Sequence, residues 1–387
     1  MKEGWEVKKL GDVCIIERGG SPRPINAYLT DSADGINWIK IGDASEGSKY
    51  ITSTKERIKP EGVKKSRMVH KGDFILSNSM SFGRPYILNI DGCIHDGWLV
   101  IHDKNNVFDK SYLYYYLGSP NIYREFQRWA VGGVVNNLNS ELVRNVQVAI
   151  PPLPEQSRIV EELDQLSNII EKKRQQLNEL DNLAQSIFYD MFGDPITNEK
   201  GWEVKKLGEV CKTSSGGTPS KSHSEYYEGG YIPWLRSGEV NKMYIFNTEL
   251  FITEEGLVNS SAKWFPENTV VIAMYGATVG QVGILRNMMT TNQAICGIFP
   301  NESLIPIYLY HFLLSKKEEY IKLASGGAQP NISQNIIKDT LVCCPPLQLQ
   351  QLFAQKIEAI EKEKELIKQS IKETEELFNS RMDYYFG

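Results

Sequence analysis

The sequence contains one long segment twice. Residues 4–14 read GWEVKKLGDVC and residues 201–211 read GWEVKKLGEVC, so that ten of the eleven positions are identical. The match continues with 19–22 (GGSP) and 216–219 (GGTP), 38–43 and 234–239, 151–152 and 345–346, and 192–193 and 386–387. The offset between matching positions drifts only from 197 to 194 residues. Because the period is so long, it indicates a tandem duplication of a whole domain and not a solenoid of small units.

Short apolar runs separated by glycine fill the larger part of each copy. The runs CIIERGG, DFILSNS and TVVIAMYG have the length and the Ile, Val and Phe content of strands, while DKSYLYYYLGS favours a helix. We therefore expect a mixed α/β (α+β) domain with a substantial sheet at residues 1–150 and a second one at residues 194–345.

A different pattern fills the end of each copy. After a proline pair, apolar positions recur at alternating spacings of 4 and 3 residues, which is the heptad pattern of a coiled coil. The predicted seam comprises Ile159, Leu163, Leu166, Ile170, Lys173, Leu177, Leu180, Ala184, Ile187 and Met191 in the first copy and Phe353, Ile357, Ile360, Lys364, Ile367, Ile371, Thr374, Phe378, Arg381 and Tyr385 in the second. Residues 151–193 and 346–387 are thus predicted to form two long helices.

The two seams have the same phase, which bears on how the helices pack. A single stripe of this kind also occurs on an amphipathic helix that packs on its own domain. Two stripes in matching phase, each following an equivalent domain, favour packing of one helix against the other. Since the first helix leads from the first domain to the second, we expect an antiparallel coiled coil, two domains related by a pseudo-two-fold axis, and chain ends that lie close together.

Composition excludes several classes of protein. Hydrophobic residues make up 41% and charged residues 24%, which is typical of globular domains. The six cysteines include no C-x-x-C pair and the five histidines are scattered, so we expect no metal site and no cofactor. The longest uncharged run, residues 268–285, is too short and too polar to span a membrane, and we expect a cytoplasmic protein with reduced thiols.

The net charge of −5 at first argues against a nucleic-acid partner. The acidic residues are unevenly placed, however, because residues 151–200 carry 5 Lys and Arg against 10 Asp and Glu. The two larger segments, residues 1–150 and 201–345, are close to neutral, so the net charge does not exclude a local basic face on either of them.

The sequence offers little catalytic chemistry. It lacks the phosphate-binding loop G-x-x-x-x-G-K-[ST], the metal motif H-E-x-x-H and the nucleophile turn G-x-S-x-G. His95 and Asp96 would suit an acid–base pair, but their counterparts Asn292 and Gln293 would not. His-Asp in the first copy and Asn-Gln in the second suit hydrogen bonding to base edges better than they suit catalysis. Asn and Gln are the side chains that pair with adenine in the major groove.

Taken together, the motifs resemble those of one family. They are the opening G-W-x-x-x-x-L-G-[DE]-V, the G-G-[ST]-P turn, the W-[IL]-[KR]-x-G-[DE] run, the strand GATVG, and P-P-L-P-E-Q at the start of a long helix. Over essentially the whole chain, the sequence is similar to the specificity subunits of type I restriction-modification systems. The second copy departs from the pattern at PPLQLQ, and the first departs at SMSFG, which stands where the second has GATVG.

The resemblance implies a non-catalytic DNA reader. Each larger segment would be a target recognition domain for one half of a bipartite site on double-stranded DNA, and the two helices would act as a spacer. The helices would also dock two methyltransferase subunits and, through the assembled complex, the restriction subunits. Because the halves diverge through residues 24–35, 44–70 and 85–110, we expect an asymmetric target.

Small polar and basic side chains, most of them near glycine, are the candidate contacts. For DNA we single out Arg23, Lys40, Ser77, Asn78, Ser81, Arg84, Lys221, Arg236, Tyr275, Thr278, Gln281, Asn292 and Gln293. For the methyltransferase we single out Glu155, Gln156 and Gln350 at the two helix starts. Trp38 and Trp234 are expected in the core.

Two other functions stay open at this point. A duplicated-domain enzyme with an active site at His95, Asp96 or Arg84 would need a substrate pocket and would act as a single chain. A protein scaffold would bind partners through the coiled coil and would show no sequence-dependent effect on DNA.

Overall fold

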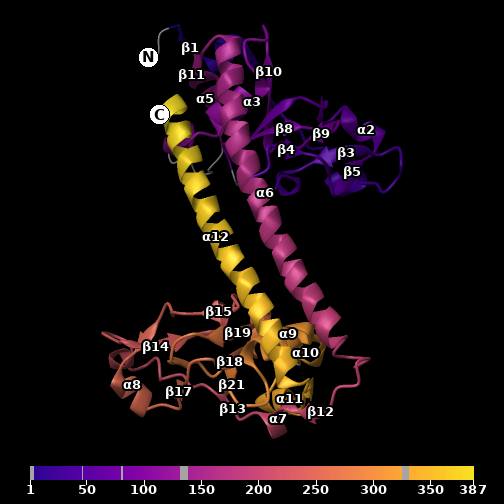
Figure 1. Cartoon of the computed structure of the whole chain (residues 1–387). Coiled ribbons are helices and arrows are strands. Elements are labelled where there is room, and N and C mark those ends of the chain that lie inside the picture. Colours follow the sequence, from indigo (N-terminus) through magenta and orange to yellow (C-terminus); the bar gives the residue numbers. More distant parts are fainter. Residues whose placement is uncertain (1–3, 46, 80–81, 131–137, 325–330) are drawn as a thin grey trace. The chain divides into compact units, whose positions relative to one another are not determined.

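The computed structural model describes residues 4–45, 47–79, 82–130, 138–324 and 331–387. The chain divides into two compact units (Figure 1). Unit 1 comprises Met1–Arg174 and Gln369–Gly387, and unit 2 comprises Gln175–Lys368. Each of the two long helices therefore contributes one part to each unit.

Three sheets and several short helices form the α/β part of unit 1. A five-stranded sheet has the order β2-β10-β7-β8-β4, a four-stranded sheet has the order β5-β3-β9-β6, and β1 pairs with β11. The strands are β1 Glu6–Lys9, β2 Cys14–Arg18, β3 Ile36–Ile39, β4 Tyr50–Ile51, β5 Glu56–Ile58, β6 Arg67–Val69, β7 Phe74–Ser77, β8 Pro85–Leu88, β9 Gly92–Ile94, β10 Trp98–Asp103 and β11 Gln147–Ile150. The helices are α1 Leu10–Val13, α2 Pro60–Val63, α3 Lys110–Leu117, α4 Pro120–Ala130 and α5 Ser140–Asn145.

Unit 2 repeats this topology strand for strand. Its sheets have the orders β13-β21-β18-β19-β15, β16-β14-β20-β17 and β12-β22. The strands are β12 Val204–Lys206, β13 Thr213–Ser215, β14 Ile232–Leu235, β15 Tyr244–Ile245, β16 Phe251–Ile252, β17 Trp264–Phe265, β18 Val270–Ala273, β19 Val282–Leu285, β20 Met289–Thr291, β21 Ile295–Ile298 and β22 Leu341–Cys343. The helices are α7 Leu207–Val210, α8 Glu254–Val258, α9 Pro306–Ser315, α10 Lys317–Leu323 and α11 Gln334–Asp339. The predicted duplication and the mixed α/β class are confirmed.

Capping side chains set where several helices begin. The carboxylate of Asp109 accepts hydrogen bonds from the backbone N–H groups of Ser111 and Tyr112 at the start of α3. Asn139 and Ser333 cap the matching helices α5 and α11 in the two units. Such caps satisfy N–H groups that the first turn of a helix leaves without a partner.

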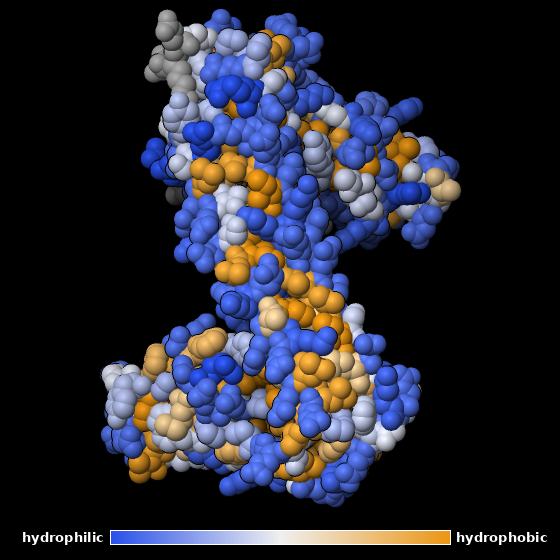
Figure 2. Space-filling view, in the orientation of Figure 1, coloured by the Kyte–Doolittle hydropathy of each residue, from blue (hydrophilic) through white to orange (hydrophobic). Residues whose placement is uncertain are grey.

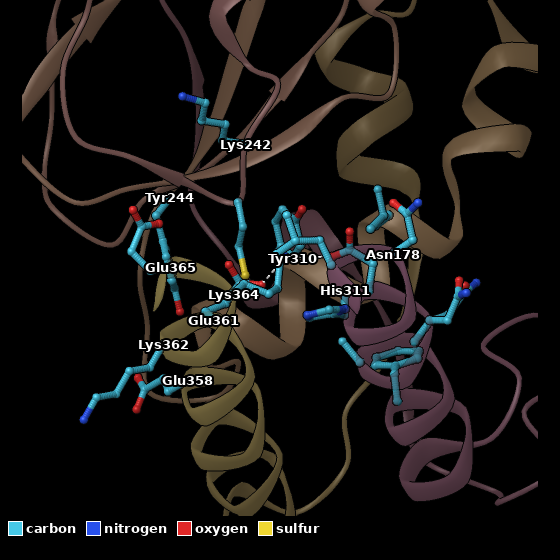
Figure 3. Close-up of a pocket in the computed structure, with 18 of the residues that line it drawn as sticks. Asn178, Lys242, Tyr244, Tyr310, His311, Glu358, Glu361, Lys362, Lys364 and Glu365 are labelled. Carbon is cyan, nitrogen blue, oxygen red and sulfur yellow. Dashed lines mark hydrogen bonds and ion pairs between the residues drawn. The ribbon is translucent and has the colours of Figure 1, made fainter. Parts of the chain in front are cut away.

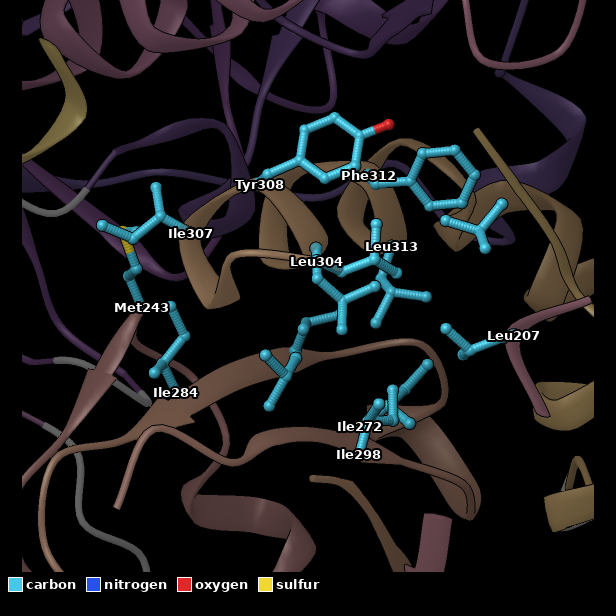
Figure 4. Close-up of a cluster of buried hydrophobic side chains, with 14 of the residues drawn as sticks. Leu207, Met243, Ile272, Ile284, Ile298, Leu304, Ile307, Tyr308, Phe312 and Leu313 are labelled. Atoms are coloured by element: carbon cyan, nitrogen blue, oxygen red, sulfur yellow. The ribbon is translucent and has the colours of Figure 1, made fainter. Parts of the chain in front are cut away.

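The main core of unit 2 lies between α9 and the five-stranded sheet. Figure 4 shows apolar side chains of α9 and its approach facing those of the sheet. The labelled members of this cluster are Leu207, Met243, Ile272, Ile284, Ile298, Leu304, Ile307, Tyr308, Phe312 and Leu313. Burial of each large apolar side chain contributes about 1.5–3 kcal/mol to folding. Trp38 and Trp234 are only 2% and 4% exposed, as expected for core residues.

The two long helices are α6 Leu153–Phe192 and α12 Leu347–Phe386, and they pack together within each unit. In unit 1, Tyr385 donates a hydrogen bond to Glu162 at 2.6 Å. In unit 2, the rings of Phe192 and Phe353 lie 5.2 Å apart.

Further contacts between α6 and α12 are the hydrogen bond from Lys173 to Ser370 in unit 1 and the one from Lys364 to Asp181 in unit 2. Residue numbers on α12 fall as those on α6 rise, so the helices are antiparallel in both units. This part of the prediction is confirmed.

Every predicted seam position is buried or half-buried, including the polar ones. The ammonium group of Lys173 donates to Ser370 Oγ at 2.6 Å and to Thr374 Oγ1 at 3.1 Å. Lys364 reaches Asp181 and Glu361, both at 2.6 Å. These polar contacts replace apolar packing at two levels of the seam and favour one register of the helices over others.

Trp5 and Phe386, near the two ends of the described chain, both lie in unit 1. The C-terminal Phe386 belongs to the same apolar cluster against which Trp5 packs. The amide of Asn121 also donates a hydrogen bond to the carbonyl oxygen of Phe386 at 3.0 Å. Trp5 and Phe386 thus share one apolar cluster, in line with the expected closeness of the two ends.

Candidate nucleic-acid interface

The glycine pair after β2 lies directly against the turn between β9 and β10. The N–H of Gly19 donates to Trp98 O at 2.9 Å, and that of Gly20 donates to Ile94 O at 3.2 Å. A Cβ atom on Gly19 would lie only 2.1 Å from the carbonyl oxygen of His95. Glycine is needed here because two backbone segments meet without room for a side chain.

Unit 2 contains the same arrangement. The N–H of Gly216 donates to Ile295 O at 3.1 Å, and that of Gly217 donates to Thr291 O at 2.9 Å. A Cβ atom on Gly216 would lie 2.3 Å from the carbonyl oxygen of Thr291. The loop that follows each glycine pair is therefore fixed over the neighbouring strand connection.

A third loop completes the group in each unit. In unit 1 the N–H of Asn78, just after β7, donates to Gly97 O at 2.9 Å. In unit 2 the N–H of Met274, just after β18, donates to Ala294 O at 2.8 Å. Each unit thus brings together three segments. They are the loop that begins at Gly19 or Gly216, the strand connection 95–97 or 292–294, and the loop that begins at Asn78 or Met274. We call this group the reading face of the unit.

A side-chain hydrogen bond ties two of these loops together in each unit. Ser21 Oγ donates to Asp96 Oδ1 at 2.6 Å in unit 1, and Thr218 Oγ1 donates to Gln293 Oε1 in unit 2. The bond from Ser21 lowers the pKa of the Asp96 carboxyl, which is therefore ionised at neutral pH. The same frame presents a carboxylate in unit 1 and a carboxamide in unit 2.

The reading face of unit 1 includes a pocket of about 720 Å³. Its lining includes Arg23, Lys40, Glu56, His95 and Asp96 beside the buried Trp38. Lys40 pairs with Glu56 at 2.5 Å, and Arg23 lies 3.8 Å from Asp96 with its side chain 83% exposed. Burial lowers the pKa of His95, which favours the neutral ring. We call this space the unit 1 pocket.

The predicted contacts after β7 hold their own loop in place. Ser77 is 1% exposed, and its hydroxyl accepts a hydrogen bond from the N–H of the half-buried Arg84 at 2.9 Å. Asn78 is 2% exposed and donates from Nδ2 to Asp96 O at 3.2 Å. Ser81 lies outside the described residues. Ser77 and Asn78 are therefore placed behind the surface and support the loops that form it.

Two buried amide oxygens lie without a partner among the described side chains. One is Oδ1 of Asn78 in unit 1 and the other is Oδ1 of Asn292 in unit 2. The main-chain N–H of Asn292 donates to Leu235 O at 2.9 Å, which places it beside Arg236. Arg236 itself pairs with Glu239 at 3.0 Å and with Glu249 at 2.5 Å.

The remaining predicted contacts of unit 2 are more open. Lys221 is exposed, and Tyr275 is 44% exposed. The hydroxyl of Thr278 donates to Tyr275 O at 2.9 Å, and the main chain of the half-buried Gln281 donates to Thr278 O at 2.9 Å. Tyr275, Thr278 and Gln281 thus share one loop of the reading face.

The predicted partner residues Gln156 and Gln350 are fully buried and form the same three bonds in the two units. Gln156 Oε1 accepts from Asp109 N–H at 2.8 Å, and its amide donates to Val107 O and Pro151 O, both at 2.8 Å.

Gln350 Oε1 accepts from Ile305 N–H at 2.8 Å, and its amide donates to Ser303 O at 3.0 Å and Pro345 O at 2.8 Å. We call these two arrangements the amide latches. Since every bond is internal, the geometry favours a structural role for Gln156 and Gln350 over direct contact with a partner.

Glu155, the third predicted partner residue, is half-buried at the start of α6. It accepts a hydrogen bond from the indole of Trp5 at 3.2 Å and lies 3.8 Å from Arg158. The sequence pattern did not single out Ser21 and Thr218, although both copies keep a hydroxyl after the glycine pair.

Unit 2 also contains a large cleft of about 1280 Å³ between α6, α9, α12 and the loop at β15. Lys364 and Glu361 project from α12, and His311 from α9, toward one another (Figure 3). Burial, with a contribution from the charge of Lys364, lowers the pKa of His311 to about 4. Arg286 stacks over Tyr244 at 4.9 Å. Lysines and carboxylates alternate around the cleft. It therefore lacks the uniformly positive lining that would favour binding of DNA phosphates.

The residues that the structure describes contain no group of three or more His, Cys, Asp or Glu side chains that could hold a metal ion. No helix among them is both long and apolar enough to cross a membrane.

The sequence matches the family described as "Type I restriction modification DNA specificity domain" over residues 2–182 and again over residues 199–376. The Type I restriction enzyme EcoR124I/EcoR124II specificity subunit of Escherichia coli is 26% identical over 299 residues, which cover 73% of this chain and 70% of that protein. The Type I restriction enzyme MjaIX specificity subunit of Methanocaldococcus jannaschii is 26% identical over 374 residues, which cover 90% and 85%.

Two solved structures share the fold. A chain described under the structural basis of complex assembly and conformational transition of the type I R-M system has a TM-score of 0.64 at 20% identity, with 100% of this chain and 98% of that one covered. The type I restriction-modification S subunit from M. genitalium has a TM-score of 0.54 at 13% identity, with 98% and 95% covered. At these identities the likeness shows the fold alone.

Proposed function

Because this chain belongs to the family of type I restriction-modification DNA specificity domains, we propose that it is the DNA sequence-specificity subunit of a type I restriction-modification complex. Its relatives are specificity subunits, which are DNA-recognition components. In the proposal, residues 1–150 and 194–345 are target recognition domains that each read one half of a bipartite target. The chain itself performs no catalysis, and methylation and cleavage are carried out by its partners.

One observation supports an asymmetric target. The two reading faces share their frame, from the glycine pairs to the hydroxyls of Ser21 and Thr218. They present different groups, however, because a carboxylate in unit 1 stands where unit 2 has the carboxamide of Gln293. A carboxylate only accepts hydrogen bonds, whereas a carboxamide both donates and accepts. Two readers with one frame and different groups should select different half-sites.

The long helices supply the surface proposed for the methyltransferase subunits. Apolar side chains gather along them between charged ones on the face that Figure 2 shows. In unit 2, Leu352 and Leu366 are 48% and 55% exposed and lie two heptads apart on α12. In unit 1, Leu377 and Tyr384 are 49% and 61% exposed and lie one heptad apart. Large exposed side chains at such spacing suit docking of a partner helix.

The function is tested by mapping DNA methylation in a host that lacks its own methylation. The chain is expressed with a type I methyltransferase subunit, and the methyltransferase alone serves as the control. We expect a new two-part motif with an unspecified gap only when both proteins are present, and the two parts should differ in sequence. A stable complex without any new motif would favour a scaffold, and a palindromic motif would contradict the asymmetric readers.

A further inference from the structure

The turn between β9 and β10 holds Asp96 in a fixed position on the reading face of unit 1. The carbonyl oxygen of Asp96 accepts hydrogen bonds from Arg18 Nε at 2.8 Å and Asn78 Nδ2 at 3.2 Å. Ser21 holds one carboxylate oxygen at 2.6 Å, while 43% of the side chain remains exposed. The carboxylate is therefore oriented by its own domain and still reachable from outside.

Arg23 stands beside this carboxylate with most of its guanidinium open to solvent. Its Nη2 lies 3.8 Å from Asp96 Oδ2, and 83% of the side chain is exposed. Both residues line the unit 1 pocket. An approaching DNA duplex would therefore meet one acceptor side chain next to one donor side chain.

These two side chains complement one base pair better than the others. In the major groove, cytosine offers an N4 amino donor and guanine offers the acceptors O6 and N7. Adenine also has an amino group, but its neighbouring N7 is an acceptor that would face the carboxylate. We propose that Asp96 and Arg23 read a cytosine–guanine pair in the half-site of unit 1, with Asp96 accepting from cytosine N4 and Arg23 donating to guanine. Ser21 acts as the positioning residue.

Unit 2 lacks this combination in the same frame. The side-chain oxygen of Gln293 accepts a hydrogen bond from Thr218, so this residue presents its amide N–H groups as donors. Ser220 stands after the proline, where unit 1 has Arg23. Asp96 and Arg23 therefore assign a cytosine–guanine pair to the half-site of unit 1, and unit 2 has no counterpart of this reader. This assignment rests on the proposed function, because it names the base pair that one of the two readers selects.

The test uses the complex of the full chain with its methyltransferase. The methylation motif is mapped for the wild type, Asp96→Asn and Asp12→Asn, and the purified complexes are then titrated with duplexes that carry each base pair at each half-site position. Asp12→Asn is the matched control, because it also removes one negative charge. Asp12 is exposed in α1, before β2, whereas the reading face begins with Gly19, after β2.

We expect Asp96→Asn to lower discrimination for one cytosine–guanine pair by on the order of 10- to 100-fold, while the other half-site stays unchanged. Ser21→Ala should weaken the same discrimination less, and Asp12→Asn should not change it. The inference is overturned if the wild-type motif has no cytosine–guanine pair in the half-site that responds to unit 1 variants. It is also overturned if Asp96→Asn weakens binding to all duplexes equally. Absence of any two-part motif for the wild type would instead reject the proposed function.

Discussion

The amide latch of unit 2 can be tested by replacing Gln350 with leucine. The side chain is fully buried and makes three hydrogen bonds of 2.8 to 3.0 Å. Two of them join the start of α12 to the chain before α9, and the third reaches Pro345 O just before α12. Leucine has a similar size but can make none of these bonds. The change leaves one N–H group and two carbonyl oxygens without this partner, and the oxygen of Pro345 is buried.

The magnitude follows from the number of bonds. A typical hydrogen bond contributes a net ~1 kcal/mol to stability, and a buried group left without a partner costs ~1–3 kcal/mol. The three bonds of Gln350 therefore amount to roughly 3–5 kcal/mol, from which the burial of a more apolar side chain recovers ~1 kcal/mol. We expect a net loss of about 3 kcal/mol, which lowers the melting temperature of a unit of this size by roughly 6–12 °C.

The assay combines scanning calorimetry with hydrogen exchange measured by mass spectrometry. Gln351→Leu is the matched control, because Gln351 is the next residue of α12 and is exposed. In Gln350→Leu the amide of Ile305 should exchange faster, since its acceptor is removed. Equal melting temperatures for the two variants, or unchanged protection of Ile305, would refute the latch.

The remaining predictions concern the reading face, a buried histidine and the seam. Gly19→Ala should destabilise unit 1 by more than ~2 kcal/mol in urea unfolding, whereas Gly42→Ala should be tolerated, because a Cβ on Gly42 meets no atom within 4 Å; similar losses would contradict the close approach. Since burial lowers the pKa of His311 to about 4, the unfolded chain binds the proton first, so stability is kept above pH ~6.5 and falls by up to about 3 kcal/mol toward pH 4. His311→Phe should make urea midpoints less dependent on pH over this range, and parallel curves would reject the reasoning. Lys173→Leu should change the free energy of unfolding by less than ~1 kcal/mol or raise it, because leucine adds apolar packing at a half-buried seam position and Thr374 keeps its bond to its own helix at 2.7 Å; a loss above ~3 kcal/mol would show that the lysine is essential.

The sequence by itself determined the features that depend on repetition and period. The duplication was visible because residues 4–14 and 201–211 are nearly identical. The long helices were visible because a heptad pattern is a local property that survives without knowledge of the fold. The antiparallel pairing followed from the matching phase of the two stripes together with the direction of the chain. Even the polar positions Lys173 and Thr374 were placed on the seam, where they meet.

Only the tertiary structure decided which polar residues meet and which are hidden. Ser21 and Asp96 are 75 residues apart, and no local pattern brings a hydroxyl to a carboxylate over that separation. The glycine pair suggested a tight turn, but the constraint comes from a distant strand connection, whose carbonyl oxygen would lie 2.1 Å from a Cβ atom on Gly19. Gln156 looks like a surface residue at a helix start, yet it is buried because main-chain groups at Val107 and Asp109 supply its partners. Burial of a polar side chain depends on where the rest of the backbone passes, and the period of a sequence carries no record of that path.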